Sequence, residues 1–294
     1  MFKRLIVATD LSAASLELVK CLGGLKAYGA EECLLLQCLS IQETSSLSLS
    51  YTLSVLEGML QNLKEVLVQQ GYIVETRVVP GIAKNEINRI AVNEDFSLIV
   101  VGAQEHTLTS EIFFGGLAYD VIHYAQKPVL LIRMEDYLQE GISFIKTLGC
   151  GMSDHILFPT DFSENADLAF NYVTKMALLG VKKITLFHVQ DKSRISKYPE
   201  DSLAKLNEID NARLQDMKNI LQEKAIAEVD TFLTYGSPAV EILKLIRERN
   251  IQLVVMGSQG RGFVKELFLG SVSNNVARHS LASVLLIPAK REND

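Results

Sequence analysis

The chain carries the same segment twice, and this internal repeat constrains its fold more than any other feature. The opening RLIVATDLSAAS matches HILFPTDFSENA from His155 at an offset of 151 positions. Three later pairs share an offset of 155 positions: GIAKNEINRIA with GSPAVEILKLI, LIVVGAQE with LVVMGSQG, and PVLLIR with SVLLIP. One net insertion of four residues in the second copy reconciles the two offsets. The sequence therefore predicts two copies of one domain in tandem.

The 294 residues suit two domains of ordinary length. We expect the first domain over residues 1–134, a linker over 135–154 and the second domain over 155–294. Within the linker, apolar residues spaced like one helix face predict a partly helical segment that the glycines at 149 and 151 end. These apolar residues are Leu138, Ile142, Ile145 and Leu148.

Within each copy, short runs of Val, Ile and Leu alternate with helical patterns, which is typical of a parallel sheet covered on both faces. In the second copy the expected strands are 156–158, 184–189, 231–234, 253–256 and 284–287. The expected helices are 165–179, 203–227, 239–249 and 272–279. The predicted fold class is α/β, with two tandem doubly wound parallel-sheet domains of five strands each. Ligands of such sheets bind where the strand order reverses, so functional residues should follow the first and fourth strands.

The charge and hydropathy of the chain argue against nucleic acids and membranes as binding partners. A formal net charge of -6 argues against nucleic-acid binding, which usually needs a concentrated basic face. No apolar stretch approaches the roughly 20 residues of a membrane span. The apolar run at the start of the chain is also too short for a signal peptide. We therefore expect a cytoplasmic protein that does not bind membranes.

The cysteines and histidines point to no metal or redox chemistry. No histidine has a metal-ligand spacing with Cys, Asp or Glu, so no metal ligand is assigned. No C-x-x-C pair occurs, and unpaired cysteines fit a reducing cytosol. The four cysteines expected to be unpaired are Cys21, Cys33, Cys38 and Cys150.

The segment after the fourth strand of the second copy has the composition of a phosphate-binding loop. It reads GSQGRG over residues 257–262 and is followed by Gly270 and Ser271, where the last helix should begin. Glycines let backbone amides approach a ligand closely, and a helix N-terminus attracts anions. Arg261 adds positive charge. A flexible glycine loop before an ordinary serine cap is the alternative, but the position after the fourth strand favours a phosphate site.

The spacing of Gly257, Gly260, Gly270 and Ser271 resembles the ATP-binding signature of the universal stress protein family. The aspartate after the first strand, the GSP turn at 236–238 and the closing SVLLIP strand also match that family. The resemblance covers both halves of the chain outside the linker. It implies a fold like that of the adenine nucleotide alpha hydrolases.

The resemblance also implies roles for single residues. Asp161 would contact the ribose or adenosine side of the nucleotide, although it also suits the start of a helix. Val189 would offer its backbone to the adenine, and Met256 would pack near the base. The glycines and Ser271 would surround the phosphates. The candidate nucleotide-binding residues are Pro159, Thr160, Asp161, Val189, Met256, Gly257, Gly260, Arg261, Gly262, Gly270, Ser271, Val272 and Ser273.

The first copy departs from this pattern at the loop. It reads GAQE over residues 102–105, so Glu105 stands where the second copy has Gly260. A carboxylate about 5 Å from a phosphate charge costs roughly 3 kcal/mol at an effective dielectric near 20. We therefore expect the nucleotide mainly in the second domain. Asp10 is retained, which leaves a nucleoside or monophosphate open to the first.

The sequence thus predicts an adenine-nucleotide-binding stress or regulatory protein that holds ATP or AMP, with Mg²⁺ accompanying the triphosphate. One alternative is a slow ATPase or phosphotransferase at the same site. Another is a structural dimerisation module without obligatory nucleotide. No catalytic residue is assigned, because no nucleophile–base pair or general base for attack on a γ-phosphate is evident.

The last strand of each copy, 129–132 and 284–287, is expected to be a sheet edge, and unpaired edges invite pairing. In the resembling family this strand commonly forms dimers. We therefore expect an intramolecular pseudo-dimer, with homodimerisation and an unidentified protein partner as further partners.

Overall fold

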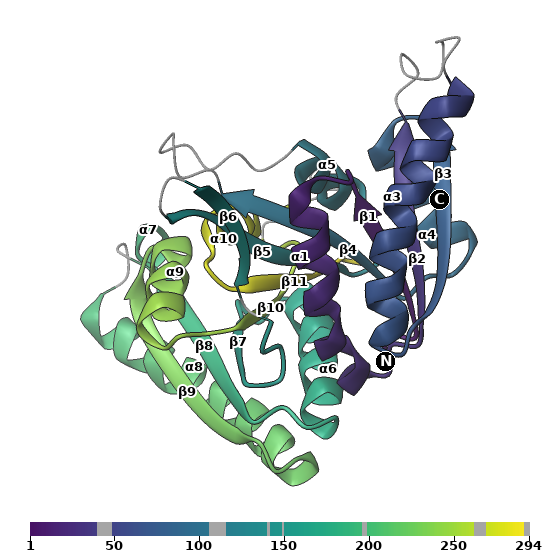
Figure 1. The fold of residues 1–294 in the computed structure, drawn as a ribbon. Helices are drawn as coiled ribbons and strands as arrows, with labels where there is room; N and C mark the ends of the chain where they lie inside the picture. The colour runs from purple at the N-terminus through teal and green to yellow at the C-terminus, as the bar shows by residue number, and fades with distance from the viewer. Residues whose placement is uncertain are drawn as a thin grey trace. The chain divides into compact units, whose positions relative to one another are not determined.

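A computed structural model divides the chain into two compact units, the first unit Met1–Cys150 and the second unit Gly151–Asp294 (Figure 1). The residues that the structure describes are 1–39, 49–105, 116–139, 142–148, 150–195, 199–261 and 269–290. None of the helices in this described part combines the length and apolarity that a membrane crossing needs.

The first unit alternates strands and helices. Its sheet has the order β3-β2-β1-β4-β5, and every neighbouring pair of these strands is parallel. The elements are β1 (Arg4–Thr9), α1 (Ala13–Cys21), the 3₁₀ helix η1 (Leu22–Tyr28), β2 (Glu32–Leu39), α3 (Leu49–Gln69), β3 (Ile73–Pro80), α4 (Ala83–Asn93), β4 (Leu98–Glu105), α5 (Gly116–Tyr124), β5 (Val129–Gln139) and β6 (Ile142–Leu148).

The second unit repeats this order. Its sheet runs β9-β8-β7-β10-β11, again with parallel neighbours throughout. The elements are β7 (His155–Pro159), α6 (Glu164–Leu178), β8 (Lys183–Asp191), α7 (Lys192–Ile195), α8 (Glu200–Lys224), β9 (Glu228–Gly236), α9 (Pro238–Glu248), β10 (Leu253–Gly257), α10 (Ser271–His279) and β11 (Ser283–Ile287). The predicted doubly wound fold is confirmed, and the strand order reverses between β1 and β4 and between β7 and β10.

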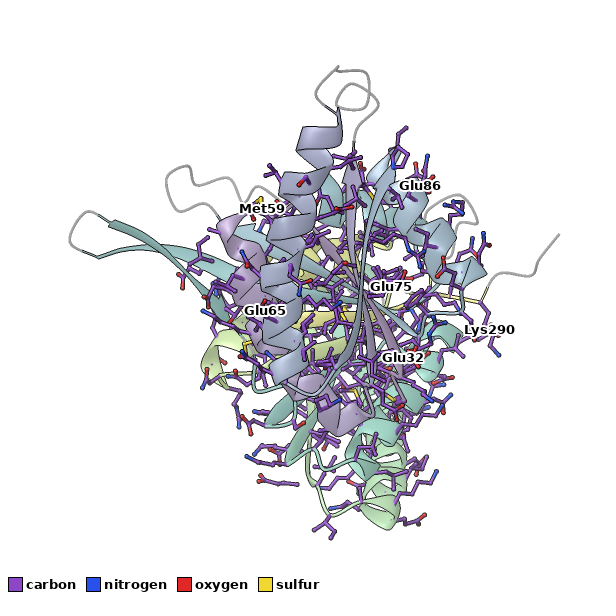
Figure 2. The ribbon with its side chains drawn as sticks, turned by 45° about the vertical axis from the view of Figure 1, so that its right-hand side comes forward. Glu32, Met59, Glu65, Glu75, Glu86 and Lys290 are labelled. Atoms are coloured by element: carbon purple, nitrogen blue, oxygen red, sulfur yellow. A yellow bond between two sulfur atoms is a disulfide. The ribbon has the colours of Figure 1, made fainter. Side chains whose placement is uncertain are left out.

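Helices cover both faces of each sheet because each helix has one apolar side. In the first unit α1 and α3 pack on one face, and α4 and α5 pack on the other (Figure 1). On α3, Leu60, Leu63 and Leu67 are buried at helical spacing. Met59 and Glu65 lie on the exposed side of the same helix (Figure 2). In the second unit α6 and α8 share one face, and α9 and α10 share the other.

The prediction of a helical linker is wrong. β5 continues to Gln139, and β6 returns antiparallel to it, with Ile145 opposite Asp136 and Leu148 opposite Arg133. A short apolar pattern fits both a helix and a strand, and here the extended β5 supplies a complete ladder of backbone partners. The first unit therefore has a sixth strand, and the boundary between the units falls at Cys150 and Gly151.

The cysteines also differ from expectation. Cys21 and Cys150 form a disulfide with a Cα–Cα distance of 5.2 Å, although 129 positions separate them in the sequence. The pairing arises because α1 packs beside β6, which brings the end of the helix to the end of the hairpin. Cys33 is a buried free thiol and Cys38 a half-buried one. The prediction that all four cysteines are unpaired is therefore wrong for two of them.

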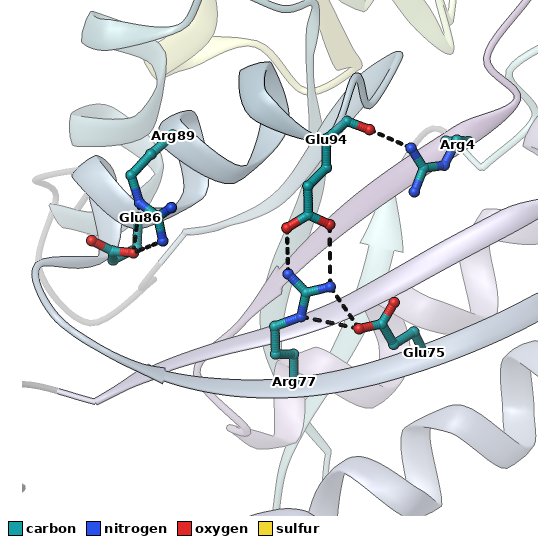
Figure 3. Close-up of polar contacts among 6 residues, drawn as sticks. All are labelled: Arg4, Glu75, Arg77, Glu86, Arg89 and Glu94. Carbon is teal, nitrogen blue, oxygen red and sulfur yellow. Dashed lines mark hydrogen bonds and ion pairs between the residues drawn. The ribbon is translucent and has the colours of Figure 1, made fainter.

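An ionic network ties the edge strand of the first unit to a helix end (Figure 3). Arg77 on β3 contacts the Glu94 carboxylate at 2.6 Å and the Glu75 carboxylate at 2.6 Å. Arg4 on β1 donates to the backbone carbonyl of Glu94. These groups are partly exposed, so each pair adds little stability by itself. The network holds β3 to the segment that follows α4.

Candidate functional site

The segments that follow β7 and β10 meet because the two strands are neighbours in the sheet. Asp161 follows β7, and Arg261 follows β10. The Arg261 amide donates to Oδ2 of Asp161 at 2.8 Å, and its Nε donates to the Asp161 carbonyl at 2.6 Å. The arrangement brings together two predicted site residues that lie 100 positions apart.

A tight turn after β7 presents the Asp161 carboxylate. Phe162 has a left-handed φ of 56°, which is unfavourable for a residue with a side chain. Its amide donates to Oγ1 of Thr160 at 3.0 Å, and the Ser163 amide donates to Oδ1 of Asp161 at 3.1 Å. Ser163 also caps α6 by accepting from the Ala166 amide. Asp161 thus uses one oxygen for its own turn and the other for the loop after β10.

Gly257 at the end of β10 and Gly260 in the following loop allow a close approach of neighbouring side chains. A Cβ at Gly257 would lie 2.6 Å from Oδ1 of Asn165, and a Cβ at Gly260 would lie 2.5 Å from Oδ2 of Asp161. Either contact would force a neighbour to move. The glycines therefore let α6 and the Asp161 carboxylate lie directly against the backbone after β10.

Asn165 is a site residue that the sequence reasoning missed. Its Oδ1 accepts from the Gln259 amide at 2.9 Å, and its Nδ2 donates to the Ile287 carbonyl at 3.2 Å. The side chain is 7% exposed and braces the loop against the end of β11. Alignment of the two copies contained the signal, because Ala14 stands at the matching position.

The first turn of α10 offers backbone amides at the same end of the sheet. Gly270 is the N-cap, and the first bond of the helix runs from the Asn274 amide to the Gly270 carbonyl at 2.8 Å. The amides of Ser271, Val272 and Ser273 precede that bond, as at any helix N-terminus. The Ser273 hydroxyl donates to the Gly257 carbonyl at 2.9 Å and ties the helix to β10.

The remaining predicted residues lie on the strands around this point. Pro159 ends β7 beside Phe187, Val189 is buried near the end of β8, and Met256 is buried in β10. Gly262 lies outside the described residues. Within the described part of the chain, no cluster of His, Cys, Asp and Glu is arranged to hold a metal ion.

The first unit has the same turn with different contacts. Leu11 has a φ of 58°, and Oδ1 of Asp10 accepts from the Ser12 amide at 2.9 Å and the Ser15 hydroxyl at 3.1 Å. Burial disfavours ionisation of this carboxyl, but the bonds from Ser12 and Ser15 outweigh it and lower the pKa of Asp10. A cavity of about 150 Å³ lies beside Asp10. It is lined by Ala8, Thr9, Asp10, Leu36, Gln37, Cys38, Ala83 and Ile87.

The strands after the switch point end differently in the two units. β10 ends at Gly257, opposite Ile287 of β11. β4 continues past the matching Gly102 to Glu105, which is paired with Glu135 of β5. Residues 103–105 of the first unit therefore extend the strand, whereas the matching residues 258–260 of the second unit form a loop.

Comparison with known proteins matches both units to the same protein family. A model of the universal stress protein family matches residues 1–133 and 152–288. Universal stress protein MJ0577 of Methanocaldococcus jannaschii is 32% identical over 160 residues, which cover 48% of this chain and 98% of that protein. A putative universal stress protein of Staphylococcus aureus strain USA300 is 30% identical over 137 residues, which cover 45% of this chain and 82% of that protein.

A solved structure shares the fold of the whole chain. The crystal structure of a universal stress protein from Archaeoglobus fulgidus DSM 4304 aligns with a TM-score of 0.72 at 23% identity. The alignment covers 97% of this chain and 98% of that chain.

Proposed function

Because the chain belongs to the universal stress protein family, we propose that its second unit binds an adenine nucleotide, ATP or AMP, in a regulatory role. The phosphates would lie at the loop after β10 and the first turn of α10. The ribose would contact Asp161. The base would lie near Val189 and Met256. A Mg²⁺ ion would accompany a bound triphosphate, held chiefly by its phosphates.

The observation that carries this proposal is the contact between Asp161 and the loop after β10. The carboxylate accepts the Arg261 amide at 2.8 Å, and Gly260 leaves it the room to do so. The contact joins the predicted ribose residue to the predicted phosphate loop at the switch point, where doubly wound sheets bind ligands.

The phosphate end of the proposal rests on α10. Its first-turn amides and the helix dipole favour an anion, and charge-assisted hydrogen bonds contribute about 1.5–3 kcal/mol each. The glycines at 257 and 270 keep side chains out of this approach. A triphosphate gains more from such a terminus than a nucleoside does, so ATP is the favoured test ligand.

The first unit is proposed to bind the triphosphate weakly. Its β4 continues through residues 103–105 in a ladder with β5, so the backbone of this segment is part of the sheet rather than a loop. Because Asp10 is retained, a nucleoside or monophosphate stays open to the first unit.

Titration calorimetry of the full chain with ATP, AMP and adenosine tests the proposal. We expect one ATP per chain, and mass spectrometry of any small molecule released from the purified protein should identify an adenine nucleotide. Multiple turnover of ATP above background would favour a slow ATPase or phosphotransferase over a protein that only binds the nucleotide. Failure of all three ligands to bind would favour the structural alternative. Pairing of the two units through β5 and β11 stays a prediction, as does a cytoplasmic location.

A further inference from the structure

Three buried polar side chains lie beneath the turn that presents Asp161. His188 and Gln190 on β8 and Asp210 on α8 are 6%, 7% and 7% exposed. Gln190 donates to Oδ2 of Asp210 at 2.9 Å, and Nε2 of His188 lies 3.5 Å from the same oxygen. An apolar side chain would fill this core position with less loss of hydration. Unlike an apolar side chain, the imidazole of His188 can also form a hydrogen bond on the side that faces away from Asp210.

The imidazole contacts both residues that flank Asp161. Nδ1 of His188 lies 2.7 Å from the Thr160 carbonyl oxygen. A carbonyl only accepts hydrogen bonds, so Nδ1 carries the proton. The imidazole also packs on the Phe162 ring, with 4.5 Å between ring centroids. Phe162 is the residue with the left-handed φ, and the Arg213 guanidinium lies 5.2 Å from its ring. His188 thus holds the strained turn from below by one hydrogen bond and one ring contact.

Burial of the imidazole favours its neutral form. Burial, the largest influence, lowers the pKa of His188. The Thr160 carbonyl, Asp210 and Asp161 oppose this, and Arg261 adds to it. The neutral ring with its proton on Nδ1 can donate to the Thr160 carbonyl near pH 7.

The first unit lacks this cluster, although its turn has the same backbone conformation. Gln37 and Leu39 stand at the positions that match His188 and Gln190, and Leu56 matches Asp210 when the buried leucines of α3 are aligned with the buried residues of α8. Nε2 of Gln37 donates to the carbonyl of its neighbour Cys38 at 3.1 Å. The cluster therefore occurs in the unit that has the glycine loop.

From these contacts we propose that His188 is a positioning residue of the second unit's site. It fixes the Thr160 carbonyl by its hydrogen bond, and through it the orientation of the Asp161 carboxylate toward the loop after β10 and toward the ligand. The proposal rests on the proposed function for the identity of that ligand. The ordering of the turn is independent of any ligand.

Two substitutions isolate the hydrogen bond to Thr160. His188→Leu removes the donor. His188→Asn keeps one, because the amide nitrogen of Asn stands the same number of bonds from Cα as Nδ1 of His. Both variants lose the imidazole ring and its approach to Asp210, so a difference between them reports whether a hydrogen-bond donor stands below the Thr160 carbonyl.

Amide hydrogen exchange of the ligand-free full chain is the first measurement, over peptides that contain residues 160–166. We expect faster exchange in His188→Leu and near-wild-type exchange in His188→Asn. Calorimetry with ATP is the second measurement. We expect His188→Leu to weaken ATP about tenfold or more, and His188→Asn to stay within about threefold of wild type.

Wild-type exchange and affinity in His188→Leu would overturn the proposal, as would equal losses in both variants. If the wild-type chain binds no ATP, the proposed function fails, and the exchange comparison alone decides whether His188 orders the turn. If thermal unfolding shows that His188→Leu does not fold, His188→Gln replaces it. We expect that variant to behave like Leu, since Gln37 donates to its neighbour's carbonyl in the first unit.

His155→Leu is the matched control. His155 begins β7, at the opposite end of the strand from the turn, and its Nε2 lies 2.8 Å from Oγ1 of Thr185. The same substitution there should leave turn exchange and ATP affinity at wild-type values. A loss of affinity equal to that of His188→Leu would show a general effect of replacing a histidine in this sheet and would also overturn the proposal.

Discussion

The two units share a strand order and a turn, but they end their fourth strands differently. In the second unit β10 ends at Gly257, and the following backbone contacts Asp161. In the first unit β4 runs three residues further, to Glu105, in ladder with β5. The backbone after the fourth strand therefore has a different role in each unit: in the first it continues the sheet beside β5, and in the second it contacts Asn165 and Asp161.

The charge of Glu105 accounts for only part of the expected difference in ATP affinity between the two units. The sequence comparison attributes the difference to a carboxylate that would repel phosphate. The structure adds that the backbone after the fourth strand pairs with β5 in the first unit and contacts Asp161 in the second. The brace at Asn165 and the histidine beneath the turn belong to the second unit, where Ala14 and Gln37 stand in the first. The second unit thus differs from the first at the site on several elements, namely α6, β8 and the loop after β10.

The largest expected effect is on the loop itself. Gly260→Glu, which copies Glu105 into the second unit, should weaken ATP binding by about 100-fold or more, since a nearby carboxylate costs roughly 3 kcal/mol. The added Cβ would also lie 2.5 Å from Oδ2 of Asp161. Calorimetry measures the change. Gly260→Ala separates the steric part from the charge.

The matched substitution in the first unit is Glu105→Gly, which should leave the affinity of the second unit unchanged. Unchanged ATP affinity in Gly260→Glu would remove the loop after β10 from the site. Two equivalent ATP sites in the wild-type chain, measured by equilibrium dialysis, would contradict the asymmetry altogether.

The two aspartates should give the next largest contrast. Asp161→Ala removes the acceptor of the Arg261 amide and should weaken ATP about tenfold or more, since a bond to a charged group contributes about 1.5–3 kcal/mol. Asp10→Ala should leave ATP affinity as it is. Equal losses in the two variants, measured by calorimetry with the triphosphate, would mean that both units bind.

The brace at Asn165 should affect stability more than affinity. Asn165→Ala, which copies Ala14, leaves the Gln259 amide and the Ile287 carbonyl without their partner. We expect a loss of about 1–3 kcal/mol in the free energy of unfolding of the second unit. Chemical denaturation followed with probes in each unit measures it, since a chain of two units need not unfold in one step. A loss confined to the first unit would be inconsistent with this assignment.

The smallest expected effect is on the dependence of stability on pH. Burial lowers the pKa of His188, so the unfolded chain takes up a proton near pH 6.5 that the folded chain does not. The second unit should therefore be fully stable above about pH 6.5 and should lose stability as the pH falls toward the folded pKa. His188→Gln should flatten this slope in thermal unfolding from pH 8 to pH 5. A slope as steep as that of the wild type would show that His188 does not titrate there.

Local patterns in the sequence determined most of the architecture. Buried parallel strands appear as continuous apolar runs and amphipathic helices as a period near 3.6, so the alternation predicted two doubly wound sheets. The repeat located the switch point in each copy. Periodicity failed over residues 135–148, where a few apolar residues fit a helix and a strand equally, and a neighbouring strand decided between them.

By itself the sequence determined the repeat, the succession of strands and helices and the residues that follow strands β7 and β10, because these depend on chemistry read within a few positions. The tertiary structure alone decided which distant groups meet. Examples are the bond from Asn165 to the Gln259 amide, 94 positions away, and the disulfide between Cys21 and Cys150. Both depend on which strands and helices become neighbours, and that is set by the packing of the whole unit rather than by any local pattern.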